Sequence, residues 1–152
     1  MTGPKAKNCV FCFTAEDAAN QQTLVVHEGR TAFVILNLYP YNNGHLMVVP
    51  RRHIASLSAL TAEELQDVAA LTQLSERALN EAYSPNGLNV GINLGKPAGA
   101  GVEEHLHVHL VPRWNGDTNF MTVVGTMRVL PEDLGASAAR LRPIFAKLTG
   151  SS

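Results

Sequence analysis

Histidine is the residue most able to do chemistry in this chain, and three histidines stand close together. His105, His107 and His109 alternate with leucine and valine in the segment HLHVHLV. In a β-strand, residues i, i+2 and i+4 project from the same face. The alternation therefore predicts a strand over residues 105–111, with three imidazoles side by side on one face and apolar side chains on the other.

A strand face made only of imidazoles has three interpretations: a solvated surface, a metal site, or catalysis on phosphate. Three histidines of one strand, spaced about 6.6 Å per step, are too far apart to converge on one tetrahedral ion, although one or two can be ligands. A neutral imidazole can attack phosphorus while a neighbour donates a proton or binds phosphoryl oxygens. The glycine-rich loop at 94–101 offers backbone N–H groups to such a site.

Cys9 and Cys12 form a C-x-x-C pair. A redox dithiol normally follows a strand of a βαβ unit, and no strand is expected here before the pair. Two interpretations remain, a pair of buried thiols and a zinc site. Zinc needs two further ligands, for which His53 and one histidine of the triplet are candidates. Thiols kept as ligands, with no other cysteine to pair with, fit a reducing cytoplasm.

The elements that must position these residues are mostly strands. Pro50 is expected to end a strand at residues 45–49, and Pro112 is expected to end the strand at residues 105–111. Short turns between the first three favour antiparallel pairing. The expected strands are residues 23–26, 31–38, 45–49, 87–93 and 105–111.

A long amphipathic helix is the clearest single element. Thr61 and Glu64 have the spacing of a capping box, and the turn at 84–87 ends the helix. One apolar stripe is expected to pack on the sheet: Leu65, Val68, Ala69, Leu71, Ala78, Leu79, Ala82 and Tyr83. The opposite side carries Glu63, Gln66, Gln73, Arg77 and Asn80.

Two shorter helices complete the expected fold. Residues 14–20 have helical composition, as do residues 138–148, where Pro143 should kink or split the helix. The sequence therefore predicts an α+β protein with an antiparallel sheet of about five strands, one long helix on a face and a short C-terminal helix.

The overall composition excludes several classes of protein. Twelve Lys and Arg against thirteen Asp and Glu give a net charge of -1, so there is no broad basic surface for nucleic acid. No apolar run reaches the length of about 18 residues that a membrane span needs, and no signal peptide is visible. A cytoplasmic protein without membrane or nucleic-acid partners is expected.

Taken together, these motifs resemble those of the histidine-triad (HIT) family of nucleotide hydrolases and transferases. The resemblance covers residues 9–113 and includes CVFC, the block NLYPYNNGHLMVVPRRH, the loop NxGxxAGAG and HLHVHLVP. The segment PRWNGDTNFM resembles the branch that contains diadenosine tetraphosphate phosphorylases and related hydrolases. The resemblance implies a single HIT domain over residues 1–152, with its core at 9–113 and an extension at 114–152.

The resemblance also implies roles for the histidines. His107 would be the nucleophile that forms a nucleotidyl-phosphohistidine, and His109 would bind the phosphate oxygens. His105 would orient the array, and His45 would supply a fourth imidazole to the site.

For nucleotide binding, the resemblance assigns Asn37 to the ribose hydroxyls and Asn93 to the neighbourhood of the phosphates. It places Phe11, Ile35 and Met47 in an apolar base pocket. Base preference and the leaving group stay open. A dinucleoside polyphosphate hydrolase or phosphorylase is expected, with a nucleoside phosphoramidate hydrolase or a slow nucleotide sensor as alternatives. Residues 100–104 contain no hydroxyl or amide side chain and so lack the serine that helps to place inorganic phosphate in the family's phosphorylases, which makes hydrolysis at least as well supported as phosphorolysis.

Two further expectations come from the family. Cys9, Cys12, His53 and His105 would hold a structural zinc ion that fixes the tautomer of His105. Family members are commonly homodimers, so a homodimer is expected. His27 fits no motif and is expected to be an ordinary strand or surface histidine.

Overall fold

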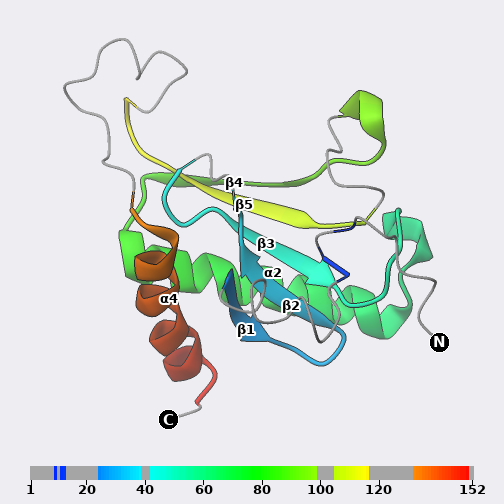
Figure 1. Ribbon diagram of the computed structural model, residues 1–152, viewed down its shortest axis with the longest axis horizontal. Helices are drawn as coiled ribbons and strands as arrows, with labels where there is room; N and C mark the ends of the chain where they lie inside the picture. The colour runs from blue at the N-terminus through cyan, green and yellow to red at the C-terminus, as the bar shows by residue number, and fades with distance from the viewer. Residues whose placement is uncertain are drawn as a thin grey trace.

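The computed structural model describes residues 9, 11, 12, 24–38, 42–98, 105–116 and 132–150. Within these residues, five strands form one antiparallel sheet in the order β1-β2-β3-β5-β4 (Figure 1). The strands are β1 (Val25–Glu28), β2 (Ala32–Leu36), β3 (Leu46–Pro50), β4 (Gly87–Ile92) and β5 (Val108–Arg113).

Two long helices accompany the sheet, α2 (Ala62–Tyr83) and α4 (Leu134–Leu148), with short 3-10 turns η2 (Leu57–Ala59) and η3 (Lys96–Ala98). Figure 1 shows α2 along one face of the sheet and α4 beside β1, where it also packs on α2. The predicted α+β class, with one long helix and a C-terminal helix, is confirmed. The helix predicted at 14–20 lies outside the described residues.

The capping box predicted at the start of α2 is present. The backbone N–H of Glu64 donates to the Thr61 hydroxyl at 3.1 Å, and the backbone N–H of Thr61 donates to the Glu64 carboxylate at 2.9 Å. Two of the donors that a helix start leaves without an intrahelical partner are thereby satisfied. The helix ends at Tyr83, where Ser84 adopts a left-handed conformation with φ 47°.

The buried face of α2 packs on the sheet, but its apolar stripe is narrower than predicted. Val68, Leu71, Ala78 and Leu79 are buried there. Against them lie the buried sheet residues Val34, Leu36, Leu46, Val48, Val108 and Leu110. Leu65 and Ala69 were predicted to belong to this stripe and are exposed instead. They lie beside β4, the last strand of the sheet, in an open apolar groove.

The C-terminal helix completes the same core with Ala138, Leu141 and Phe145. Pro143 was predicted to kink or split this helix; it lies inside α4, which continues past it to Leu148 and is therefore not split. Pro143 has no N–H, so the helix lacks one hydrogen bond to the carbonyl of Ala139. Ala139 and Pro143 are both exposed, so water can satisfy that carbonyl. No helix in the described part of the chain combines the length and the hydropathy of a membrane span.

The bounds of β5 differ from prediction at both ends. The strand begins at Val108, whose partners are Val48 on β3 and Ile92 on β4. The residues before it lie beyond these pairs, and the Leu106 N–H donates instead to the Ile54 carbonyl at 2.7 Å. Pro112 lies within the strand, opposite Leu88 of β4 and beyond the last described pair of β3 with β5 at Leu110, so its missing N–H removes no described bond between β3 and β5.

The sheet face opposite α2 carries one row of neighbours across all five strands. In register, the row runs through Val25, Ile35, Met47, His109 and Gly91. Its apolar members join a second buried cluster with Phe33, Val49, Cys9 and Phe11. The histidines therefore lie on the sheet face that no helix among the described residues covers.

Candidate active site and metal centre

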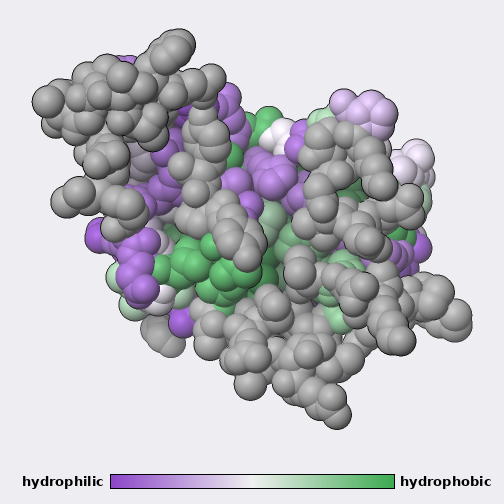
Figure 2. Space-filling model, turned by 45° about the horizontal axis from the view of Figure 1, so that its top comes forward, coloured by the Kyte–Doolittle hydropathy of each residue, from purple (hydrophilic) through white to green (hydrophobic). Residues whose placement is uncertain are grey.

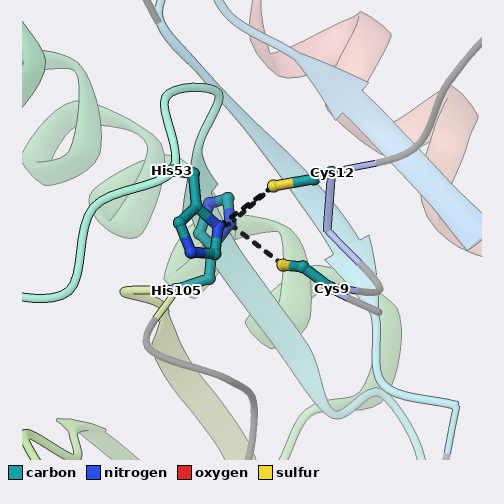
Figure 3. A group of neighbouring side chains, drawn as sticks. All are labelled: Cys9, Cys12, His53 and His105. Carbon is teal, nitrogen blue, oxygen red and sulfur yellow. Dashed lines mark hydrogen bonds between the residues drawn. The ribbon is translucent and has the colours of Figure 1, made fainter. Parts of the chain in front are cut away.

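Four possible metal ligands from three segments of the chain converge beside the end of β3 (Figure 3). Their ligand atoms all lie within 4.8 Å of one another. Nδ1 of His105 is 3.3 Å from Sγ of Cys9 and of Cys12, and 3.1 Å from Nδ1 of His53. Around a tetrahedral zinc ion, ligand atoms stand about 3.3–3.8 Å apart. Two thiols and two imidazoles at this spacing are compatible with zinc.

The tautomer of His105 suits a metal ligand. Its Nε2 lies 2.8 Å from the carbonyl oxygen of Pro50, so Nε2–H is the donor and Nδ1 keeps its lone pair. Burial lowers the pKa of His105 to about 4, outweighing the hydrogen bond to Pro50, so the ring is neutral at pH 7. A ligand imidazole whose second nitrogen donates to a carbonyl is the usual arrangement at zinc sites.

The segment that carries His53 is tied to the start of α2. The Arg52 guanidinium donates to both oxygens of Glu64, at 3.0 and 2.7 Å, and also to the Ala59 carbonyl. These bonds lower the pKa of the Glu64 carboxyl to about 2. Since Glu64 also caps α2, one carboxylate connects the helix start to the residue next to His53.

His107 stands between the metal centre and the other histidines. Its Nδ1 lies 2.8 Å from the backbone carbonyl of His105, so Nδ1–H donates and Nε2 keeps the lone pair. The Phe11 ring packs against it with centroids 5.2 Å apart. Burial lowers the pKa of His107, although the hydrogen bond to His105 opposes this shift. The ring is thus neutral at pH 7, with Nε2 as its basic nitrogen.

A second imidazole pair lies next to His107. Nε2 of His45 is 2.9 Å from Nδ1 of His109, and the rings of His107 and His109 meet edge to face, with centroids 4.6 Å apart. Burial lowers the pKa of both His45 and His109 to about 4, with nearby imidazoles adding to the effect. The side-chain amide of Asn37 lies 3.4 Å from Nε2 of His45.

The residues predicted to bind nucleotide all lie on this face or at its edge. Phe11, Ile35 and Met47 are buried in the second apolar cluster. Asn93 follows β4, is exposed, and lines a hollow together with His45 and His109. The structure therefore brings the predicted polar residues close to His45 and His109 and the predicted apolar ones into the buried cluster of the same sheet face.

Arg113 and Asn89, which no sequence motif singled out, line the same hollow. The Arg113 guanidinium donates to the side-chain oxygen of Asn89 at 2.9 Å. Arg113 continues the alternation of His105, His107 and His109, and extending that pattern past Pro112 would have found it. The expectation that Pro112 ends the strand is wrong, because β5 continues to Arg113.

His27, the histidine that fits no motif, lies in β1 away from these groups. Its ring stacks on Phe145 of α4, with centroids 5.2 Å apart. It is half-buried and packs on a structural helix, as expected for an ordinary strand histidine.

Comparison with known proteins places this arrangement in a family. The chain is 48% identical over 114 residues to the AP-4-A phosphorylase of Mycobacterium tuberculosis, which covers 75% of this chain and 58% of that protein. It thus spans little more than half the length of this relative. Protein hit of Bacillus subtilis is 30% identical over 131 residues, 85% of this chain and 88% of that protein.

A zinc-bound relative has the same fold. The crystal structure of a Zn-bound histidine triad family protein from Mycobacterium smegmatis covers 95% of this chain and 98% of its own, with a TM-score of 0.74 and 32% identity. The family model described as HIT domain matches residues 18–116. The chain belongs to the HIT domain family.

Proposed function

We propose that the protein is a nucleotide hydrolase or nucleotidyltransferase that attacks the α-phosphate of an adenine nucleotide through a nucleotidyl-histidine intermediate. The observation that carries the proposal is the state of His107. Its Nδ1–H is committed to the His105 carbonyl, and Nε2 is left as a neutral nucleophile beside His109.

In the proposed reaction, Nε2 of His107 forms a bond to the α-phosphorus while the bond from that phosphorus to the leaving oxygen breaks. The leaving group departs with the bonding electrons and takes its proton from water. Water then attacks the phosphorus, the P–N bond breaks, and a nucleoside monophosphate is released. If inorganic phosphate attacks instead, the product is a nucleoside diphosphate.

His109 and His45 have supporting roles in this scheme. Nδ2 of Asn37 can only donate to Nε2 of His45, so Nε2 keeps its lone pair and accepts from Nδ1–H of His109. His45 thereby holds the His109 ring in place, and a proton taken up on Nε2 of His109 would be donated to a phosphoryl oxygen. Donors aimed at oxygens that gain charge in the transition state are worth about 100-fold or more in rate.

The binding roles follow the positions of the remaining residues. Asn37 and Asn93 would hold the ribose and the phosphates, and Phe11, Ile35 and Met47 would form the wall of the base site. When bound, zinc would supply a structural cross-link between the N-terminal segment, the segment of His53 and His105. Thiol ligands fit a reducing cytoplasm, where we propose the protein acts.

A dinucleoside polyphosphate is the proposed substrate, because the AP-4-A phosphorylase relative is named for one. The test is product analysis on diadenosine tetraphosphate, with and without inorganic phosphate. ATP plus AMP would identify hydrolysis, and ADP in the presence of phosphate would identify phosphorolysis. Turnover of a nucleoside phosphoramidate alone would favour that substrate class instead.

The His107→Ala variant tests the mechanism. We expect a loss of turnover of at least about 1000-fold with retained AMP binding, because the nucleophile is removed but the binding residues stay. Full activity of this variant would contradict the mechanism. AMP binding by the wild type without turnover would point to a nucleotide sensor, and zinc binding without nucleotide binding to an adaptor protein.

We also propose that the protein is a homodimer joined through α2 and β4. Leu57, Leu65 and Val90 are 40%, 49% and 51% exposed, and they border an apolar groove of about 450 Å³. Among the described residues β4 is the edge strand next to β5, so we propose that its outer side pairs with a second copy. On the face drawn in Figure 2, apolar residues gather near the centre with hydrophilic residues beside them.

Sedimentation or light scattering of the Val90→Glu variant tests the dimer. We expect a dimeric wild type and a monomeric variant, because a buried carboxylate at the interface is strongly unfavourable. Leu38→Glu is the matched control, since Leu38 is equally exposed, at 51%, but lies outside the groove. A monomeric wild type would contradict the proposal.

A further inference from the structure

The hollow on the histidine face extends beyond the histidines along β5. It has a volume of about 350 Å³, within the range of small-molecule sites. His45, His109, Gly91, Asn93, Asn89 and Arg113 all contribute to its lining. Gly91 pairs with His109, and among the described residues, its two chain neighbours aside, no atom lies within 4 Å of where its side chain would begin. The absence of a side chain there keeps the space beside His109 open.

Arg113 lies at the far end of this hollow. It is four residues after His109 on the same face of β5, a distance of about 13 Å along the strand. Asn89, on the neighbouring strand, pairs with Val111 and accepts the hydrogen bond from the guanidinium at 2.9 Å. This cross-strand bond holds the guanidinium at the hollow, although the Arg113 side chain is partly exposed.

The charges of the lining residues differ from one end to the other. Burial keeps His45 and His109 neutral at pH 7. Among the described residues that line the hollow, Arg113 is the one with a permanent charge, and none is a carboxylate. A guanidinium binds phosphate through two parallel hydrogen bonds. For a polyanion in the hollow, the cationic side chain is therefore Arg113, at the end of the hollow away from His107.

We propose that Arg113, positioned by Asn89, forms a subsite for the distal phosphates of a polyphosphate chain. It would thereby select substrates with several phosphates over those with one. This inference rests on the proposed function, which places the α-phosphate at His107. A group attached directly to the α-phosphate, as in a phosphoramidate, ends near the histidines, whereas a polyphosphate continues along the hollow to Arg113.

Binding measurements in the non-reactive His107→Ala background test the subsite. Calorimetric titration compares AMP with adenosine 5′-tetraphosphate. We expect Arg113→Gln to weaken tetraphosphate binding about tenfold or more and to leave AMP binding unchanged, since a charge-assisted hydrogen bond is lost. Arg113→Lys should restore part of the loss. Arg51→Gln is the matched control, because Arg51 pairs with Glu28 outside the hollow.

The outcomes separate the subsite from the function on which it rests. Equal weakening of AMP and tetraphosphate by Arg113→Gln, or no weakening of either, would overturn the subsite. Titration of inorganic tripolyphosphate provides the second arm. If the protein binds tripolyphosphate in an Arg113-dependent manner but does not bind AMP, the subsite stands and the nucleotide function falls. If the protein binds AMP and the Arg113→Gln change leaves tripolyphosphate binding unchanged, only the subsite proposal is refuted.

Discussion

The backbone carbonyl of His105 accepts the hydrogen bond that orients His107, at 2.8 Å, while the His105 side chain belongs to the metal centre. A single residue thus joins the two sites through different groups, its imidazole on one side and its carbonyl on the other. Because the His105 ring is also fixed by the Pro50 carbonyl, it has little freedom to move. His105 therefore links the metal centre directly to His107, the proposed nucleophile.

Cys12→Ser should remove most of the bound zinc. A serine hydroxyl is a much weaker zinc ligand than a thiolate, and Sγ of Cys12 lies 3.1 Å from Nδ1 of His53 and 3.3 Å from Nδ1 of His105. We expect zinc content to fall well below one per chain and the free energy of unfolding to fall by at least about 2 kcal/mol. Elemental analysis and urea unfolding measure these changes. A chelator should destabilise the wild type but not the variant; equal effects on both would contradict the site.

Thr61→Ala should destabilise the protein by about 1 kcal/mol, because the first turn of α2 loses its cap. Urea unfolding measures the change. Thr61→Ser is the control, since serine keeps the hydroxyl that accepts the Glu64 N–H. If serine and alanine cost the same, the cap does not stabilise the helix.

Gly44→Ala should cost about 2 kcal/mol or more, because two effects add. Gly44 has a φ of +77°, and an added Cβ would lie 2.8 Å from the Tyr83 ring. That ring is held by the hydrogen bond from its hydroxyl to Glu132, at 2.7 Å, so it cannot easily move aside. Gly87→Ala, with no atom within 4 Å of its Cβ, is the matched control and should change stability by less than about 0.5 kcal/mol. Equal stability of both variants in urea would argue against the close approach.

His45 should make stability depend on pH between about 6.5 and 4. Its folded-state pKa is lowered to about 4 from an ordinary value of 6.5, so the unfolded chain binds the proton first. The stabilisation is therefore complete above pH 6.5 and is lost as pH falls towards 4. The effect is about 3 kcal/mol at most. Unfolding of His45→Gln, measured at a series of pH values, should show a shallower slope; a slope parallel to the wild type would contradict the prediction.

Several features of the fold could be read from local sequence alone. The T-x-x-E spacing identified the start of α2 because a capping box involves only residues three positions apart. The alternation of HLHVHLV identified the face of the histidines because period two is a property of the extended backbone itself. The ends of β5 could not be read this way, since they depend on where β3 and β4 stop pairing with it.

The metal centre shows the same division. The C-x-x-C pair indicated two ligands, and the sequence offered His53 and one histidine of the triplet as the other two, but only the family resemblance singled out His105. The fold brings Cys9 to His105 across 96 positions of sequence. No local pattern encodes such a contact, because it arises from how the N-terminal segment packs against the sheet.

By itself, the sequence determined the fold class, the long helix and the alternation that gathers the histidines on one face, all of which follow from short-range periodicity. The tertiary structure decided which neighbours those residues meet. Strand register set Met47 beside His109 and Asn89 near Arg113, and the end of the sheet at β4 left Leu65 and Ala69 exposed. Strand register and the burial of helix residues against the sheet depend on residues far apart in the chain. They are therefore fixed only when the whole sheet and its helices pack together.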